Sequence, residues 1–402
     1  MSWHQARLSD ISEVVTGSTP STFNVDYYGG DIPFITPTQL NKEIYVGDSA
    51  TYVTQAGAKA ARLIPKNSVM VCCIGSLGKI GISSRPLITN QQINSLVINE
   101  NIADPLYVYF YCRTLSNVLE NMAPKTTVAI VNKSRFSELT IPLPSLATQK
   151  HIARVLEQAY QLRKQAQQMK NELNQLAQSL FLEMFGDPIK NPKGWVKVPI
   201  SHFVDEFEGG KSVAAAGDES AASKFRVLKI SAVTWREFNP SESKPLPEEY
   251  QPVSSHFVRK GDLLFSRANT TELVGATSYV FEEYDNLLLP DKLWRFVWKN
   301  DVELSPMFIW NLFMDPSFRI ELGKLSSGSG GSMKNISKGK LLPFEVIFPP
   351  SEMQKSFEKK FLKIRDEILA CRRKAAECNA IFESLMQRAF NGELTAPARK
   401  AG

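Results

Sequence analysis

The chain of 402 residues contains two similar copies of one sequence pattern, and this internal repeat limits its possible folds more than any other feature. Residues 66–71 (KNSVMV) are echoed by residues 260–265 (KGDLLF), 194 positions later. Earlier pairs lie 192 positions apart: Trp3 and Trp195, Leu8 and Ile200, Val15 and Phe207, Gly17 and Gly209. Later pairs settle at 205: Val131 and Ile336, Lys133 and Lys338, Ile141 and Val346, Pro144 and Pro349, Gln149 and Gln354, Lys150 and Lys355. Such a repeat indicates two copies of one structural unit, with small insertions in the loops of the second copy.

Each copy consists of a mixed block followed by a long helix. Short runs of β-branched and aromatic residues between turn residues predict strands at 68–74, 94–98, 262–265 and 293–297. Further helices are predicted near 105–122 and 306–325. The predicted fold is α+β, with two similar globular domains separated by two long antiparallel coiled-coil helices in a pseudo-two-fold repeat. The predicted parts are 1–147 (first block), 148–187 (first long helix), 188–350 (second block), 351–395 (second long helix) and 396–402 (tail).

The two long helices carry apolar residues at alternating spacings of four and three, which is the period of a coiled-coil seam. The first seam is Val155, Ala159, Leu162, Ala166, Met169, Leu173, Leu176 and Leu180. The second seam is Phe357, Phe361, Ile364, Ile368, Cys371, Ala375, Cys378, Phe382, Leu385 and Ala389. Ser145 and Ser351 are the predicted N-caps, and Gly186 and Gly392 follow the predicted helix ends.

Each seam is also compatible with an ordinary amphipathic helix that packs on its own block. The length of the pattern argues against this alternative, because residues 149–184 would form about 54 Å of helix. One block offers no apolar surface of that length. We therefore expect the two helices to bury their seams on each other and to hold the two blocks apart.

Composition limits the class of protein. Hydrophobic residues make up 43% of the chain, which is enough for two or more domains with cores. The chain shows no signal-peptide pattern and no run of roughly 18 apolar residues, so a cytoplasmic protein without membrane contact is expected. Five cysteines without a CxxC pair argue against a disulfide framework or a zinc site. The net charge of +6 supports nucleic-acid binding only weakly, because residues 188–350 carry equal numbers of acidic and basic groups.

The motifs of common catalytic sites are incomplete in this chain. Residues 210–212 (GKS) would complete a phosphate-binding loop only with glycine at position 205, which is Asp205. Residues 290–292 (PDK) lack the downstream acidic-x-Lys element of a nuclease, and the glycine-rich run 326–332 lacks a strand-GxGxxG-helix arrangement. No metal-ligand or triad spacing connects the four histidines, His4, His151, His202 and His256. We therefore expect no catalytic residue, no metal and no cofactor on this chain.

Two similar blocks at a fixed separation suit an extended, periodic ligand, and duplex DNA, with a helical turn of about 34–36 Å, fits best. A protein that reads bases needs phosphate anchors together with donors and acceptors that reach the groove edges. The predicted DNA contacts lie in equivalent loops of the two copies: Thr19, Gly75, Ser76, Lys79, Gln91, Gln92, Lys125, Thr126, Thr127, Lys133, Lys211, Arg267, Asn269, Thr270, Lys292, Ser329, Ser332, Lys334 and Lys338.

Two of these residues have side chains suited to reading bases. Arg267 is predicted to bind the O6 and N7 atoms of guanine, and Asn269 the N6 and N7 atoms of adenine. Glycines near Ser329 and Ser332 would allow a phosphate to approach the backbone closely. For each single residue, an ordinary solvated loop is the alternative interpretation.

Four short motifs follow one another along the chain in a characteristic order. They are residues 16–20 (TGSTP), residues 141–149 (IPLPSLATQ), which open a long helix, residues 185–188 (FGDP), and residues 346–354, which are the second copy of 141–149. In this order and duplication the chain resembles the specificity subunits of type I restriction-modification systems, over essentially its whole length. Residues 16–20 are similar to the Gly-x-Thr-Pro turn of that family, and 185–188, followed by Trp195, are similar to its junction before the second block. Residues 209–212 (GGKS) depart from the turn, which fits a second block that reads a different sequence.

The resemblance implies that each block recognises one half of a split duplex DNA target and that the helices set the spacer. It also implies that two modification subunits dock on the chain and methylate adenine with S-adenosylmethionine, and that restriction subunits use ATP and magnesium. These cofactors are expected on the partner subunits only. The main alternative is a coiled-coil scaffold with duplicated protein- or glycan-binding domains, and salt-sensitive binding to duplex DNA would separate the two.

Overall fold

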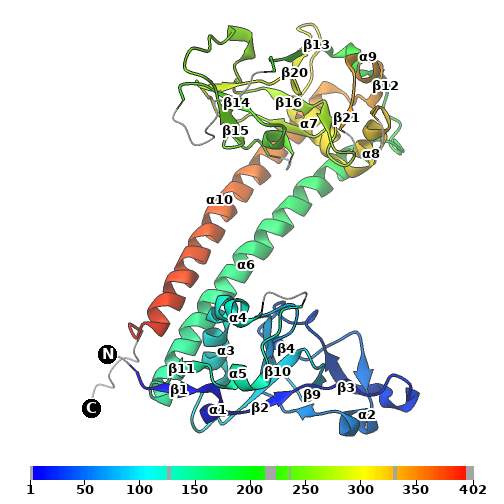
Figure 1. Cartoon of the computed structure of the whole chain (residues 1–402). Coiled ribbons are helices and arrows are strands. Elements are labelled where there is room, and N and C mark those ends of the chain that lie inside the picture. The colour runs from blue at the N-terminus through cyan, green and yellow to red at the C-terminus, as the bar shows by residue number, and fades with distance from the viewer. Residues whose placement is uncertain (1–2, 125–127, 213–222, 235–236, 329–332, 395–402) are drawn as a thin grey trace, which may run out of the picture. The chain divides into compact units, whose positions relative to one another are not determined.

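The computed structural model describes residues 3–124, 128–212, 223–234, 237–328 and 333–394. The chain divides into two compact units, which are residues 1–167 with 373–402 (unit 1) and residues 168–372 (unit 2). Both units share the two long helices, α6 (Leu146–Phe185) and α10 (Ser351–Phe390), each of 40 residues (Figure 1). The predicted α+β class with two long helices is confirmed. Among the helices that the structure describes, none combines the length and the apolar character needed to cross a membrane.

Unit 1 is built on two sheets. The five-stranded sheet has the order β2 (Ser12–Thr16), β10 (Ile93–Ile98), β7 (Val69–Cys72), β8 (Ile80–Ser83) and β4 (Tyr45–Val46). The four-stranded sheet has the order β5 (Tyr52–Val53), β3 (Tyr28–Ile35), β9 (Leu87–Thr89) and β6 (Leu63–Ile64), and β1 (Gln5–Arg7) pairs with β11 (Thr140–Pro142). The remaining elements are α1 (Leu8–Ile11), η1 (Val25–Tyr27), α2 (Gln55–Ala60), α3 (Pro105–Thr114), α4 (Ser116–Met122) and α5 (Lys133–Ser137).

Unit 2 repeats the central part of this architecture. Its four-stranded sheet has the order β13 (Val204–Gly209), β20 (Leu293–Trp298), β16 (Leu263–Ser266) and β18 (Thr277–Tyr279). The other pairings are β15 (Ser243–Pro245) with β14 (Arg226–Leu228) and β19 (Leu287–Leu288), β12 (Lys197–Pro199) with β22 (Glu345–Ile347), and β17 (Ala268–Asn269) with β21 (Lys334–Asn335). The helical elements are η2 (Ile200–His202), η3 (Ile230–Val233), η4 (Ser254–His256), α7 (Pro306–Met314), α8 (Pro316–Lys324) and α9 (Lys338–Leu341).

The strand pairing supports the repeat and corrects its register. Phe207 pairs with Phe296, as Val14 pairs with Leu96 in unit 1, so the counterpart of Phe207 is Val14. The predicted match of Phe207 with Val15 is therefore wrong by one residue. The cause is a β-bulge directly after Val204, which adds one residue to β13 and moves the later matches from an offset of 192 to 193.

The helices predicted at 105–122 and 306–325 are each broken in two. In unit 1 the break lies at Leu115, which ends α3 and precedes α4. In unit 2 it lies at Asp315, whose carboxylate caps α8 while Pro316 occupies the first helical position. Because proline has no backbone N–H to donate, α7 cannot continue through it.

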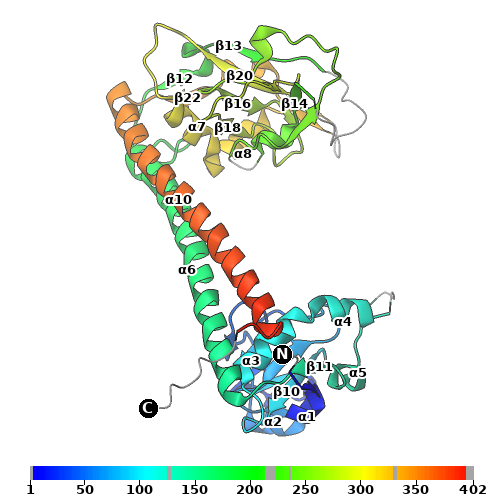
Figure 2. The same ribbon diagram turned by 90° about the vertical axis from the view of Figure 1, so that its left-hand side faces the viewer.

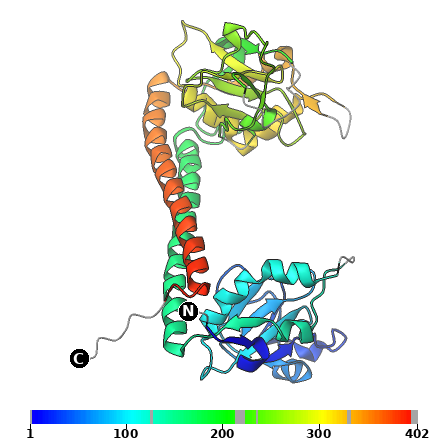
Figure 3. The ribbon, with the colours of Figure 1, turned by 60° about the vertical axis from the view of Figure 1, so that its left-hand side comes forward.

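Within each unit the two long helices pack on each other in antiparallel fashion, and their ribbons run side by side in Figures 2 and 3. In unit 1 the ring centroid of Tyr160, in α6, lies 6.1 Å from that of Phe382, near the end of α10. In unit 2 the ring centroid of Phe181, near the end of α6, lies 5.7 Å from that of Phe357, near the start of α10. The helices end as predicted, since Gly186 and Gly392 both have positive φ angles.

One of the two predicted N-caps is confirmed. The Ser145 hydroxyl accepts a hydrogen bond from the Thr148 N–H, with 3.3 Å between the two atoms. Ser351 is wrong as a cap by one residue, because it is the first residue of α10 and its hydroxyl donates to Glu303. The two serines therefore stabilise their helices in different ways.

The second predicted seam is confirmed, but the first is partly wrong. Every residue of the second seam is buried or half-buried. Three residues of the first seam are exposed, Leu162, Met169 and Leu176, with 56%, 52% and 50% of their surface accessible. The buried face of α6 carries Leu156 and Phe181 instead. The reason is that α6 also packs on the core of each block, so its buried face follows the helical period rather than a strict seam.

Candidate nucleic-acid interface

Three segments that are distant in the sequence meet in unit 2. The backbone N–H of Arg267 donates to the carbonyl of Lys292 at 3.1 Å, and the carbonyl of Arg267 accepts from the N–H of Ile336 at 2.9 Å. Next to this point, Asn269 pairs with Lys334 across β17 and β21. The predicted contacts in these segments, which are Arg267, Asn269, Lys292, Lys334 and Lys338, therefore belong to one region.

The side chain of Arg267 is held on the face of an indole. Its guanidinium carbon lies 5.6 Å from the ring centroid of Trp294, and the Lys338 ammonium lies 5.6 Å from the same centroid. Nε of Arg267 donates to the carbonyl of Asp291 at 2.8 Å, and Nη2 lies 3.6 Å from the Asp291 carboxylate. The arrangement presents two cations on one aromatic platform, and the neighbouring carboxylate holds the arginine in place.

Further cations border this platform. Lys334 donates from Nζ to the carbonyl of Gly328 at 2.7 Å. Lys211 is exposed directly after Gly210, whose N–H donates to the carbonyl of Pro290 at 3.1 Å. A Cβ atom at Gly210 would lie 1.6 Å from the carbonyl oxygen of Leu289, so only glycine permits this approach.

Asn269 turns inward in this structure. Only 5% of its surface is exposed, and its Oδ1 accepts from the N–H of Thr270 at 2.9 Å. The side chain therefore shapes the turn before Thr270, which is itself exposed. The predicted contact of Asn269 with an adenine edge would require this turn to open.

The corresponding region of unit 1 is rich in amides. Gly75 donates from its N–H to the carbonyl of Ala129 at 2.9 Å, and Gln92 donates from Nε2 to the carbonyl of Ile74 at 3.3 Å. The Thr19 hydroxyl donates to Oε1 of Gln91 at 2.9 Å. The structure thus brings four of the predicted contacts, Thr19, Gly75, Gln91 and Gln92, to one side of the block.

Three more predicted contacts of unit 1 occupy nearby loops and a helix start. Ser76 is exposed in the turn after β7, and Lys79, half-buried, closes that turn by accepting from the N–H of Cys72 at 2.8 Å. Lys133 is exposed at the first position of α5, as Lys338 is in α9. The predicted contacts Lys125, Thr126, Thr127, Ser329 and Ser332 lie outside the residues that the structure describes.

The structure also adds two residues that the sequence did not single out. Trp294 follows a buried strand pattern and is 7% exposed, so its role as a platform emerges only from the cations packed on it. Phe23 follows the turn at residues 16–20, and 98% of its surface is exposed. A signal for Phe23 was available, because a phenylalanine stands in a polar loop directly after Ser21 and Thr22.

Two cysteine thiols lie in the unit 1 part of this region, and both are buried. Burial raises the pKa of the Cys73 thiol to about 12 and also raises the pKa of Cys72, so both remain protonated at neutral pH. Within the described part of the chain, no group of three or more His, Cys, Asp or Glu side chains could hold a metal ion. What the region offers is amide, guanidinium and ammonium groups on loops, which suits binding.

The fold and this region define a class: a protein with two similar α+β blocks, each carrying a polar loop cluster, joined by two long helices. A family model, "Type I restriction modification DNA specificity domain", matches residues 2–175. The MjaIX specificity subunit of Methanocaldococcus jannaschii is 32% identical over 213 residues, 48% of this chain and 49% of the relative. The MjaVIII specificity subunit of the same organism is 23% identical over 398 residues, 93% of this chain and 88% of the relative.

Solved structures agree with this class. The S subunit of a type I restriction-modification system from M. genitalium has the same fold, with a TM-score of 0.62, 13% identity and 96% of each chain covered. A chain from a study of complex assembly and conformational transition of the type I R-M system matches with a TM-score of 0.54, 17% identity and 98% of each chain covered. The chain is thus similar to the specificity subunits of type I restriction-modification systems, most clearly over residues 2–175, where the family model matches. It spans about half the length of the MjaIX subunit, the first relative described.

Proposed function

We propose that this chain is the DNA sequence-specificity subunit of a type I restriction-modification complex. Each block would read one half of a bipartite duplex target, and α6 and α10 would set the unread spacer. The observation that carries the proposal is the loop cluster that recurs in both copies. In each copy the loop after the central strand meets the segment before a short helix that begins with lysine, Lys133 or Lys338.

The two copies place different chemistry at equivalent positions, which supports two different half-sites. The N–H of Cys73 in unit 1 donates to the carbonyl of Gln92, directly before β10, and the N–H of Arg267 in unit 2 donates to the carbonyl of Lys292, directly before β20. Cys73 therefore corresponds to Arg267, and Gln92 to Lys292. The preceding residues, Gln91 and Asp291, correspond as well. Amides can both donate and accept, whereas guanidinium only donates and carboxylate only accepts. Groove edges are distinguished by such donor and acceptor patterns.

The similarity to these specificity subunits also supports a set of partners for this chain. Two modification subunits would dock on this chain and methylate adenine with S-adenosylmethionine, and restriction subunits would add ATP- and magnesium-dependent cleavage. This chain would contribute recognition alone, in the cytoplasm. The alternative of a scaffold with protein- or glycan-binding blocks draws no support from the matches named above, which carry the names of type I restriction-system components.

Exchange of one block between relatives tests the proposal. The chain would be produced with its modification partner in cells, and methylated adenines would be mapped across the genome. Replacing residues 188–350 with those of a relative should change one half-site and leave the other half-site and the spacer intact. The reciprocal exchange of residues 1–147 is the matched control and should change only the other half-site. A change of both half-sites by either exchange, or no methylation that depends on this chain, would contradict the proposal.

A further inference from the structure

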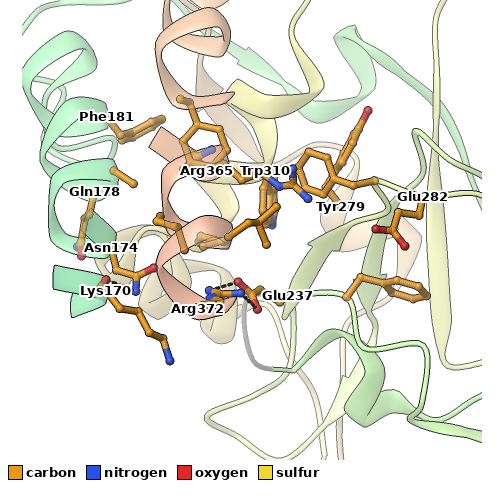
Figure 4. A pocket seen from close by; sticks show the side chains of 18 of the residues that line it. Lys170, Asn174, Gln178, Phe181, Glu237, Tyr279, Glu282, Trp310, Arg365 and Arg372 are labelled. Carbon is orange, nitrogen blue, oxygen red and sulfur yellow. Dashed lines mark hydrogen bonds and ion pairs between the residues drawn. The ribbon is translucent and has the colours of Figure 1, made fainter. Parts of the chain in front are cut away.

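Unit 2 contains a pocket of 810 Å³ where α6, α10 and the second block meet (Figure 4). Ala177 and Phe181 of α6 line it, together with Arg365 of α10, Trp310 of α7, and Tyr279 and Phe281 at the end of β18. Its lining includes none of the predicted DNA contacts. Its volume lies within the range of about 300–1,000 Å³ that is typical of small-molecule sites.

The repeat shows that the fold does not require this pocket. The offset of 205 that relates the long helices makes Phe382 the counterpart of Ala177, and Tyr160 the counterpart of Arg365. In unit 1 the Phe382 ring fills the equivalent space, with its centroid 6.2 Å from that of Phe110 and 6.1 Å from that of Tyr160. The second copy is open because alanine stands where the first copy has a phenylalanine ring.

A second side chain that occupies this space in unit 1, that of Arg113, also has no equivalent in unit 2. Arg113 stacks on the rings of Tyr109 and Tyr160, with its guanidinium carbon 5.8 Å from each centroid, and donates to the Tyr109 hydroxyl at 3.1 Å. The helices α3 and α7 begin at Pro105 and Pro306, 201 positions apart, so the counterpart of Arg113 is Met314, which has no donor. The counterpart of Tyr109 is Trp310. The polar groups of the first copy are therefore satisfied internally, whereas those of the second copy have lost their internal partner.

The walls of the pocket combine aromatic faces with unused donors. The guanidinium carbon of Arg365 lies 3.3 Å from the ring centroid of Phe281. Among the described residues, Arg365 forms no hydrogen bond, and its ion pair with the adjacent Asp366 spans 3.7 Å. The buried Nε1 of Trp310 likewise has no acceptor in the described part of the chain. A buried donor without an acceptor is costly, so Nε1 of Trp310 favours a ligand that supplies an acceptor, and the half-buried Arg365 lies in the same lining to pair with an anion.

The surrounding charges limit how negative such a ligand can be. Arg372 is already paired with Glu237 on the rim, as the dashed lines of Figure 4 show. Glu282 lines the pocket as well and would repel a second negative charge. Lys170 and Asp315 line the pocket too, and Arg365 is the arginine of the described lining that has no hydrogen-bonded partner. Burial lowers its pKa because the charge is partly removed from water. An anionic group on a ligand can therefore pair with Arg365, whereas a second anionic group would face Glu282.

We propose that this pocket binds a flat aromatic ligand that carries a single anionic group. The ring of the ligand packs among Tyr279, Phe281 and Trp310, in the space that Phe382 occupies in the first copy. The anionic group contacts the guanidinium of Arg365. Because the ligand touches α6, α10 and the block at once, its binding stabilises unit 2 against unfolding.

Fluorescence titration with 1-anilinonaphthalene-8-sulfonate, a flat aromatic monoanion, tests the proposal on the full chain. One saturable site per chain is expected. Ala177→Phe, which introduces the residue of the first copy, should weaken binding at least tenfold by filling the space. Arg365→Gln should also weaken binding at least tenfold, because it keeps a polar hydrogen-bonding side chain but removes the positive charge. Arg373→Gln, at an exposed position of α10, is the matched control and should leave binding unchanged.

A neutral analogue separates the two contributions. N-phenyl-1-naphthylamine has the same rings without the sulfonate, so Ala177→Phe should abolish its binding and Arg365→Gln should not change it. Circular dichroism and thermal melting show whether each variant is folded. If Ala177→Phe does not fold, the comparison of Arg365→Gln with the unchanged chain still tests the proposal. Sulfonate binding that is the same in Arg365→Gln and in the unchanged chain would overturn the proposal, as would several equivalent sites. The test uses no DNA and no partner, so its outcome is independent of the proposed function.

Discussion

The side chain of Gln149 accepts a hydrogen bond from the backbone N–H of Asp104, with Oε1 and N 2.9 Å apart. Its Nε2 donates to the carbonyl of Pro144 at 2.9 Å. Gln354 makes the same two bonds in unit 2, to the N–H of Ser305 at 3.0 Å and to the carbonyl of Pro349 at 2.8 Å. Both glutamines are fully buried. In each copy this amide ties the start of a long helix to the start of the helix that covers the sheet.

Replacing Gln354 with leucine should lower the free energy of unfolding of unit 2 by about 2 kcal/mol. The substitution leaves the N–H of Ser305 and the carbonyl of Pro349 buried without a partner. Urea denaturation followed by tryptophan fluorescence measures the loss, because unit 2 contains Trp294 and Trp310. Gln175→Leu, at an exposed position of α6 within unit 2, is the control and should stay within about 0.5 kcal/mol. Equal effects of the two substitutions would show that the buried amide does not matter.

Replacing Arg267 with alanine should weaken binding to the specific DNA target by about 1–3 kcal/mol, and binding to unrelated duplex by much less. The reason is that a guanidinium that reads a base edge contributes only where that base is present. Titration of the complex formed with the modification subunit, using target and scrambled duplexes at fixed salt, measures both affinities. Lys260→Ala, at an exposed position of the same block, serves as the control. An equal loss on both duplexes would identify Arg267 as a phosphate contact instead.

The carboxylate of Asp187 should contribute to stability at neutral pH and lose that contribution in acid. Its pKa is lowered mainly because the N–H of Lys190 donates to its Oδ1 at 2.9 Å, with the N–H of Ile189 doing the same. A carboxyl whose pKa is lower in the folded state stabilises above its ordinary pKa, and the stabilisation disappears as the pH falls through the lowered value.

Asp187→Asn tests this assignment because the amide keeps an oxygen acceptor but carries no charge. The melting temperature of the variant should fall less between pH 7 and pH 3 than that of the unchanged chain. Asp285→Asn, at an exposed position of the same unit, is the control and should follow the unchanged chain. Parallel curves for Asp187→Asn and the unchanged chain would refute the contribution.

Much of the candidate interface was predictable, because equivalent loops of a repeat must lie at equivalent places. The matched positions of Lys133 and Lys338 led to the short helices at which both clusters lie. Trp294 was not predictable as a platform, since its neighbours in the sequence indicate only a buried strand. The burial of Asn269 was not predictable either, because it results from pairing with Lys334, 65 positions away by residue number.

The sequence by itself determined the duplication, the class of elements and the ends of the long helices. These features depend on local periodicity, prolines and glycines, which act over a few residues. The tertiary structure alone decided which face of α6 is buried, leaving Leu162 exposed and Phe181 covered. It also decided that Ala177 borders an open pocket while its counterpart Phe382 fills one. The physical reason is that burial depends on which distant segments pack against a residue, and no local pattern records that.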